Sequence, residues 1–242
     1  MKTKIWAHRG ASCYAPENTL AAFELASKYG ADGVELDVQL TKDNVPVVIH
    51  DERIDRVSNY TGYVKDYTLK ELKCFSFNNK LSGYGHVEIP TLEEVYELIK
   101  PTNMTVNVEL KNSIILYDGL EEKVLKTAEK IGIGKRVIYS SFNHYSLVRL
   151  KKIDSSVKTG ILFADGFIDI PEYALRIGVD ALHPSLHILQ LPCFIEDSRA
   201  KKLPLHVWTV NEEEHMRLLI KNQIAAIITD KPDLARKIAD EK

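Results

Sequence analysis

The chain has 242 residues, with 32 lysines and arginines against 34 aspartates and glutamates. This balance provides no basic excess, which argues against a nucleic-acid-binding protein and against binding to an anionic membrane surface. Three widely spaced cysteines (Cys13, Cys74 and Cys193) without a CxxC motif indicate reduced thiols in a cytoplasmic protein, not a disulfide framework. The first residues, MKTKIWAHRG, lack the apolar stretch of a secretory signal, and no run of about 18 apolar residues predicts a membrane span.

Short β-rich segments alternate with amphipathic helical segments along the chain. The expected strands are 4–8, 34–40, 47–49, 106–110, 137–140, 159–163, 181–183, 205–210 and 226–229. The expected helices are 18–28, 91–100, 119–130, 145–153, 171–177, 194–201 and 212–221. Asn18 or Thr19 is expected to cap the first helix, and Thr91 forms a capping box with Glu94 in the second. This alternation predicts a parallel sheet with helical crossovers, and the chain length is typical of an eight-stranded barrel.

Nine strands are one too many for such a barrel, and a hairpin accounts for the extra strand. Asp43-Asn44 suits a two-residue turn, which makes the strand at 47–49 antiparallel to the strand at 34–40. The returning strand then lies outside the barrel. The same turn pairs Asp37 with His50, which places this histidine close to the acidic face of the hairpin. The fold class expected is therefore α/β, a (β/α)8 TIM barrel with a hairpin extension of its second strand.

Residues 52–88 interrupt the alternation of strands and helices. They are rich in tyrosine, asparagine, glycine and lysine, and they contain one short helix at 69–73. Because the segment is longer than an ordinary loop, we expect an insertion subdomain over the C-terminal face of the barrel. The whole chain, 1–242, is otherwise expected to be a single domain.

Carboxylates lie on two of the expected strands, and two of them are two residues apart on the same strand. Glu35 and Asp37 share one face of the second strand, and Glu109 ends another strand in VNVELK. A solvated face of an amphipathic strand is the ordinary explanation. In a barrel, however, such acids face the interior near the C-terminal rim, where they need a cation. Three carboxylates form an oxygen-only site suited to Mg²⁺ or Ca²⁺ rather than zinc.

Cationic and imidazole side chains lie at the same expected strand ends. Arg9 and Lys111 balance the remaining negative charge and suit the oxygens of a phosphate. A Glu and a Lys two residues apart, as at Glu109 and Lys111, more commonly form an ion pair at the surface. His8 and His50 at one rim can divide the roles of acid and base. The other histidines are expected to be structural or at the surface, with His183 the least certain because it also lies at a strand end.

Two aromatic residues at strand ends have two possible roles. Trp208 and Phe142 either pack in the core or form an apolar wall for a substrate. Helix capping accounts for most of the PENT sequence at 16–19 and for the TD sequence at 229–230.

The ordered set of these motifs resembles the glycerophosphodiester phosphodiesterase family, cytosolic bacterial type, whose members are TIM barrels related to phospholipase C-like phosphodiesterases. The matching pieces are HRG from His8, PENT from Pro16, ELDVQLTKDNVPVVIHD from Glu35, DERIDR and TLKEL in the insertion, IPTLEE from Ile89, VELK from Val108, SSF from Ser140, VWTVN from Val207 and TDKPD from Thr229. Each piece alone is weak, but they occur in the family order over nearly the whole chain. The segment 75–87 matches least well.

The resemblance implies a role for each candidate residue. His8 and His50 would be the acid–base pair, Glu35, Asp37 and Glu109 would bind one divalent cation, Arg9 and Lys111 would hold the phosphate, and Trp208 and Phe142 would contact the organic part of the substrate. It also implies hydrolysis of a small-molecule glycerophosphodiester to sn-glycerol 3-phosphate and an alcohol. A lysophospholipase D and a non-catalytic phosphodiester- or metal-binding module remain as alternatives, as do water and the glycerol 2-hydroxyl as the attacking group.

Overall fold

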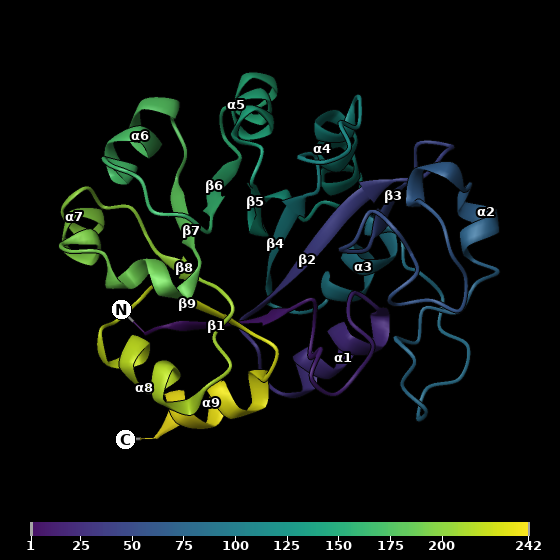
Figure 1. Cartoon of the computed structure of the whole chain (residues 1–242), viewed down its shortest axis with the longest axis horizontal. Coiled ribbons are helices and arrows are strands. Elements are labelled where there is room, and N and C mark those ends of the chain that lie inside the picture. Colours follow the sequence, from purple (N-terminus) through teal and green to yellow (C-terminus); the bar gives the residue numbers. More distant parts are fainter. Residues whose placement is uncertain (1, 242) are drawn as a thin grey trace.

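Eight parallel strands alternate with helices in the computed structural model, which describes residues 2–241. The strands are β1 Lys4–His8, β2 Gly33–Leu40, β4 Thr105–Leu110, β5 Val137–Ser141, β6 Lys158–Phe163, β7 Ala181–Pro184, β8 His206–Val207 and β9 Ala226–Thr229. Hydrogen bonds join them in the order β7-β6-β5-β4-β2-β1-β9-β8, and the sheet curves through the centre of the molecule (Figure 1). The expected (β/α)8 barrel is confirmed.

The barrel is nearly closed between its two end strands, β7 and β8. The backbone amide of Leu182 donates to the carbonyl of Pro204 at 3.0 Å, and the amide of Trp208 donates to the carbonyl of Pro184 at 3.2 Å. The expected strand at 205–210 is shorter in the structure, because regular pairing with β9 stops at Val207.

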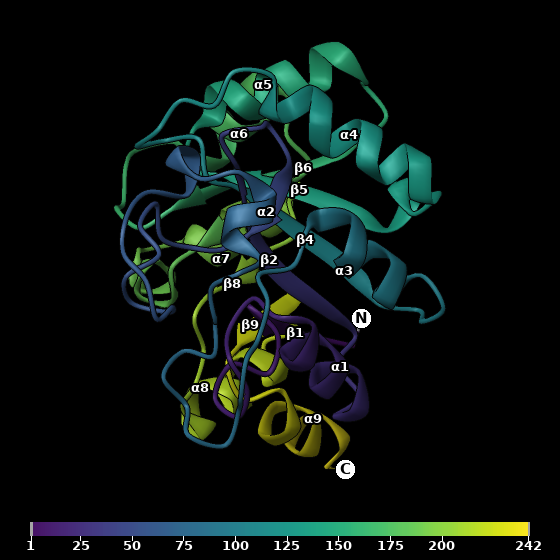
Figure 2. The same cartoon turned by 90° about the vertical axis from the view of Figure 1, so that its right-hand side faces the viewer.

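Helices surround the strands on the outside of the barrel (Figure 2). They are α1 Leu20–Lys28, α3 Leu92–Ile99, α4 Leu120–Ile131, α5 His144–Ile153, α6 Ile170–Ile177, α7 Phe194–Ala200, α8 Glu213–Lys221 and α9 Pro232–Asp240. Thr19 caps α1 by accepting a hydrogen bond from the Ala22 amide, and Thr91 and Glu94 form the expected capping box of α3. None of the helices in residues 2–241 has the length and apolar character needed to cross a bilayer.

The extra strand, β3 Pro46–Val48, is antiparallel to β2 and lies outside the barrel order, as expected. Its register differs from the prediction. The Ile49 amide donates to the Asp37 carbonyl at 2.9 Å, so Ile49 rather than His50 lies opposite Asp37. The predicted pairing of Asp37 with His50 is therefore wrong by one residue.

The hairpin loop explains this difference. The loop has three residues, 42–44, instead of two: the Asn44 amide donates to the Thr41 carbonyl at 2.9 Å, and Asn44 adopts a φ of 63°. One extra loop residue shifts the pairing by one position. His50 nevertheless reaches the acidic face, because β3 ends at Val48 and the alternation of side chains ends with it.

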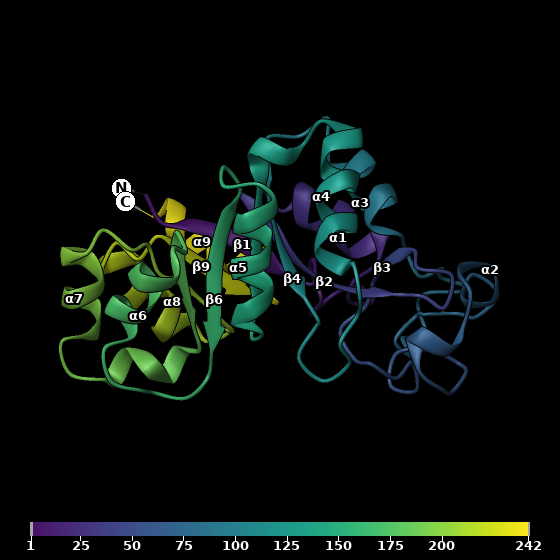
Figure 3. The ribbon, with the colours of Figure 1, turned by 90° about the horizontal axis from the view of Figure 1, so that it is seen from above.

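Residues 52–88 project beyond the hairpin and contain the short helix α2 Leu69–Leu72, close to the expected 69–73 (Figure 3). Apolar side chains of this segment pack with those of the hairpin in a separate small core: Val47, Ile49, Ile54, Val57, Val64, Leu72, Phe77 and Ile89. Arg56 connects the segment to the loop after β1 through an ion pair with Glu17. The division of the chain into a barrel and an insertion subdomain stays a prediction.

Two histidines and a tryptophan fill the barrel interior. The ring of His206 lies 4.5 Å from Trp6 and 4.6 Å from His183, and His206 Nδ1 lies 2.8 Å from His183 Nε2. Gly160 makes room for this layer, since a Cβ atom there would lie 2.3 Å from His183 Nε2. His183 is therefore buried in the barrel and is not among the residues that line the cavity described below.

Candidate active site

Three neighbouring strands align the acidic residues and one histidine. In the parallel register, His8 of β1 lies beside Glu35 of β2, and Asp37 of β2 lies beside Glu109 of β4. Because side chains alternate along a strand, Glu35 and Asp37 share the inward face with Glu109. The period-two pattern in the sequence and the parallel register together produce this cluster.

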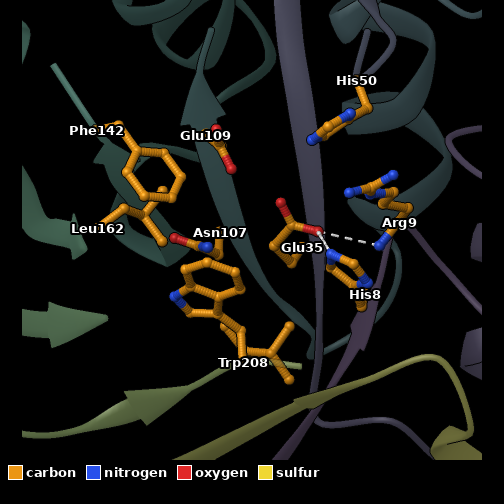
Figure 4. A pocket seen from close by; sticks show the side chains of 10 residues that line it. His8, Arg9, Glu35, His50, Asn107, Glu109, Phe142, Leu162 and Trp208 are labelled. Carbon is orange, nitrogen blue, oxygen red and sulfur yellow. Dashed lines mark hydrogen bonds and ion pairs between the residues drawn. The ribbon is translucent and has the colours of Figure 1, made fainter. Parts of the chain in front are cut away.

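A cavity of about 250 Å³ opens at this end of the barrel. One wall is polar and the other is apolar (Figure 4). The lining residues are His8, Arg9, Glu35, His50, Asn107, Glu109, Phe142, Leu162, Trp208 and Ile228. Seven of the nine residues expected at the site line this one cavity. Asp37 and Lys111 do not line it, although both lie next to its acidic wall.

Glu35, Asp37 and Glu109 each offer a carboxylate oxygen within 4.8 Å of the others. Burial, together with the charges of Asp37 and Glu109, raises the pKa of Glu35 well above its usual value, and burial with the charge of Asp37 raises the pKa of Glu109. Burial alone would raise the pKa of Asp37, but nearby cations, Arg9 foremost, lower it to about 2. A cation bound between them would stabilise the ionised form of all three groups.

The cluster fits a hard divalent cation. Its donors are carboxylate oxygens, which Mg²⁺ and Ca²⁺ prefer. The Oδ1 atom of Asp37 is buried without a hydrogen-bond partner among residues 2–241, so it has a free lone pair for a cation. The Oδ2 atom of Asp37 accepts a hydrogen bond from Asn18 at 2.9 Å, which fixes the carboxylate plane.

The two expected phosphate-binding cations lie on either side of the acids. Arg9 donates from its backbone amide to Glu35 at 3.0 Å, and its guanidinium pairs with Glu17 at 2.9 Å and with Asp37 at 3.5 Å. Lys111 Nζ lies 3.0 Å from Glu109 and 4.0 Å from Asp37. Both cations therefore neutralise the acidic cluster, and Arg9 also lines the cavity.

Each of the two candidate catalytic histidines is held by a carboxylate. His8 Nδ1 lies 2.6 Å from Asp230, and His50 Nδ1 lies 2.6 Å from the adjacent Asp51. Each carboxylate accepts a hydrogen bond from the Nδ1–H group, so Nε2 is left for the cavity side, where Arg9 lies between the two rings (Figure 4). Despite burial, the hydrogen bond from His8 lowers the pKa of Asp230 to about 2.

A glutamine fixes the loop that carries His50. The Nε2 atom of Gln39 donates to the carbonyls of three successive residues, Ile49, His50 and Asp51, at 2.8–3.2 Å. The Oε1 atom of Gln39 accepts a hydrogen bond from the hydroxyl of Tyr117 at 2.9 Å. His50 thus gains a defined position although it lies outside regular β-structure.

The two expected aromatic residues form part of the apolar wall. Phe142 and Trp208 meet edge to face, with ring centroids 5.7 Å apart. The indole of Trp208 donates to the carbonyl of His183 at 2.7 Å, which orients its ring. Both residues therefore line the cavity, and their contact with a substrate stays a prediction.

Similarity to known proteins identifies the family of this chain. The model of the glycerophosphoryl diester phosphodiesterase family matches residues 8–234. The chain belongs to this family. A glycerophosphodiester phosphodiesterase of Caldanaerobacter subterraneus subsp. tengcongensis is 46% identical over 237 residues, which cover 96% of each chain. The stated resemblance is confirmed, and with it the expectation that the chain is an enzyme, a phosphodiesterase.

Solved structures of the family share the fold of this phosphodiesterase. The structure of glycerophosphodiester phosphodiesterase from Thermotoga maritima is 31% identical with a TM-score of 0.83, covering 98% of this chain and 99% of that one. A phosphodiesterase of Oleispira antarctica, solved in complex with the product sn-glycerol-3-phosphate, is 28% identical with a TM-score of 0.88, covering 99% and 98%.

Several residues around the site of this phosphodiesterase were not predicted as functional from the sequence. Asp51 follows His50 directly, and this adjacency was the available signal. The sequence around Asp230 indicates only a helix cap, and that around Glu17 only a helix start. Asn107 lies two residues before Glu109, so the same period-two pattern that indicated the acids also indicates this residue.

Proposed function

We propose that this phosphodiesterase hydrolyses glycerophosphodiesters to sn-glycerol 3-phosphate and an alcohol, with a divalent cation bound by Glu35, Asp37 and Glu109. The observation that carries the proposal is that two histidines, each held by a carboxylate, line one cavity together with Glu35 and Glu109, two members of the three-carboxylate cluster. A cation bound there would neutralise charge on a non-bridging phosphate oxygen. The product found in the Oleispira antarctica relative supports the choice of substrate.

The proposed catalytic roles follow from the fixed imidazoles. His8 and His50 each keep Nδ1 engaged, so Nε2 is available to take a proton from the attacking oxygen or to give one to the leaving alcohol. Arg9 and Lys111 add positive charge beside the phosphate as negative charge develops on its oxygens. The apolar wall of Phe142 excludes water from the organic part of the substrate.

The test is release of sn-glycerol 3-phosphate from glycerophosphocholine and glycerophosphoethanolamine. Purified protein would be treated with a chelator and then assayed with Mg²⁺ or Ca²⁺ restored. We expect no release after chelation, recovery with one of the metals, and loss of turnover by roughly 10²-fold or more in His8→Ala and His50→Ala. His215→Ala is the matched control, since His215 is exposed on α8. Normal turnover in His8→Ala or His50→Ala would overturn the acid–base assignment.

Two attacking groups are compatible with this arrangement, water and the glycerol 2-hydroxyl. Attack by the hydroxyl produces a cyclic phosphate, whereas attack by water does not. Phosphorus NMR of single-turnover samples distinguishes them: a transient cyclic phosphate supports the internal route, and its absence supports water.

A second candidate substrate class is lysophospholipids. Four apolar side chains in the segments that follow β4, β5 and β6 are 76–88% exposed: Ile114, Leu116, Tyr145 and Ile168. These strands are neighbours in the sheet, and their C-terminal ends surround the cavity. Lysophospholipase D activity would show as release of lysophosphatidic acid from lysophosphatidylcholine. Leu116→Ser with Ile168→Ser should lower that release and leave glycerophosphocholine hydrolysis unchanged.

Two further inferences accompany this function. The three cysteines are free and exposed, which supports a reducing, cytoplasmic location. The separate core of residues 52–88 supports an insertion subdomain beside the cavity. Limited proteolysis that cuts first within 78–85 and leaves the barrel intact would support this division.

A further inference from the structure

Asn107 is a polar residue of the cavity that none of the proposed catalytic roles uses. It lies on β4, lines the cavity and is only 1% exposed. Its Oδ1 atom has no hydrogen-bond partner among residues 2–241. A buried amide oxygen without a partner destabilises the folded protein, so a polar group in this position requires a compensating role.

The position of Asn107 marks the boundary between the two walls. In the sheet register it lies beside Glu35, and it precedes Glu109 by two residues, so it shares their inward face one layer deeper than Glu109. On the other side it meets the apolar wall, and Figure 4 shows its side chain between Glu35 and the side chains of Leu162 and Trp208. A ligand whose phosphate meets Arg9 would extend its carbon skeleton toward Asn107.

The side-chain amide of Asn107 is suited to a ligand hydroxyl as its hydrogen-bond partner. Phosphate oxygens carry negative charge and accept hydrogen bonds, and Arg9 and Lys111 already provide positive charge beside the cluster. Asn107 is neutral and can both donate and accept, as a hydroxyl does. The surrounding side chains Leu162 and Trp208 suit the CH and CH₂ groups that carry such a hydroxyl.

We propose that Asn107 determines specificity for the glycerol moiety by hydrogen bonding to one of its free hydroxyls. This inference rests on the proposed function for the choice of glycerol as the polyol. It adds a requirement for a ligand hydroxyl near Asn107, which the catalytic residues do not impose. A phosphate ester that lacks this hydroxyl leaves the Asn107 amide unpaired. Arg9, Lys111 and the cation bound by the carboxylates would then hold the phosphate end of any ligand, and Asn107 would distinguish glycerol from a plain alkyl chain.

The experiment compares two ligands that differ only in their hydroxyls, sn-glycerol 3-phosphate and n-propyl phosphate. Their dissociation constants would be measured by calorimetry for the Mg²⁺-loaded wild-type protein and for Asn107→Leu. We expect the wild type to prefer sn-glycerol 3-phosphate by at least about tenfold. Asn107→Leu should lose this preference through weaker binding of sn-glycerol 3-phosphate, while its affinity for n-propyl phosphate stays within about twofold.

Two controls separate this role from others. Leucine has a similar volume and no polar atoms, so the thermal midpoint of Asn107→Leu should equal or exceed that of the wild type. If that variant is less stable, Asn107→Ala is measured in its place. Mg²⁺ affinity without phosphate ligand should be unchanged, since Glu35, Asp37 and Glu109 all remain.

Each other outcome overturns the proposal. An unchanged preference in the variants, or no preference in the wild type, removes Asn107 from glycerol recognition. Equal weakening of both ligands, or weaker Mg²⁺ binding, assigns Asn107 to the phosphate or to the cation. The proposed function has its own test: it fails if the wild type releases no sn-glycerol 3-phosphate from glycerophosphocholine. The two failures are distinguishable, because the binding comparison does not depend on turnover.

Discussion

Arg56 and Asp51 form an ion pair that connects the insertion to a candidate catalytic residue. The Nε atom of Arg56 lies 2.7 Å from Asp51 Oδ2, and Asp51 Oδ1 lies 2.6 Å from Nδ1 of His50. The same guanidinium donates to both carboxylate oxygens of Glu17 at 2.7 and 2.8 Å. Since Glu17 also pairs with Arg9, a continuous series of ion pairs connects residues 52–88 to His50 and Arg9 on the polar wall of the cavity.

The first prediction concerns the ion pairs of Arg56. Arg56→Met should lower kcat by about tenfold and leave Mg²⁺ affinity unchanged, because Asp51 and Glu17 lose the group that holds them while the carboxylate cluster stays intact. Arg53→Met is the matched control, since Arg53 pairs with Asp55 within the same segment. Wild-type kcat in Arg56→Met would show that the ion pairs of Arg56 have only a structural role.

The second prediction concerns the carboxylate behind His8. Asp230→Asn should lower kcat by roughly 10²-fold or more, because an amide does not hold the imidazole in the tautomer with a proton on Nδ1. Asp233→Asn is the control, as its carboxylate contacts Tyr14 at the surface. Steady-state assays with glycerophosphocholine measure the effect, and equal activity of the two variants would contradict it.

The third prediction concerns the cation site. Glu109→Gln should weaken Mg²⁺ and Ca²⁺ binding by at least about tenfold, because it removes one of three clustered charges. Calorimetric titration of chelator-treated protein measures this. Glu172→Gln serves as the control, since Glu172 lies on the surface and pairs with Lys201. An unchanged titration would remove Glu109 from the cation site.

The fourth prediction separates phosphate binding from cation binding. Lys111→Met should weaken inorganic phosphate binding, because it removes a positive charge beside the phosphate site. Its Mg²⁺ affinity should not fall, since Glu109 and Asp37 lose a competing cation. If Mg²⁺ affinity falls while phosphate affinity stays constant, Lys111 acts only by positioning Glu109.

The fifth prediction concerns stability against acid. Burial lowers the pKa of His206 to about 3, and burial with the adjacent His206 lowers the pKa of His183 well below its usual value. Below about pH 6.5 the unfolded chain protonates both residues while the folded protein does not. The free energy of unfolding should therefore fall as pH decreases from 6.5 toward 3. Denaturant titrations at several pH values measure the slope, which His206→Gln should reduce by about 1.4 kcal/mol per pH unit.

Local patterns in the sequence determined the fold and much of the site. Alternating apolar residues and helix caps such as Thr19 and Thr91 act over a few neighbours, so the strands, the helices and the barrel class followed from them. The two-residue spacing of Glu35 and Asp37 placed both on one face for the same reason. The resemblance of the ordered motifs to a known family then indicated the reaction class.

Tertiary structure alone decided how these residues are supported. The contact of His8 with Asp230 spans 222 residues, and that of Arg56 with Glu17 spans 39, so neither leaves a periodic signal in the sequence. The hairpin register depended on one residue of loop length, which short-range preferences for Asp43 and Asn44 did not distinguish. Such features depend on the simultaneous packing of distant segments, whereas strand and helix formation depend mainly on near neighbours.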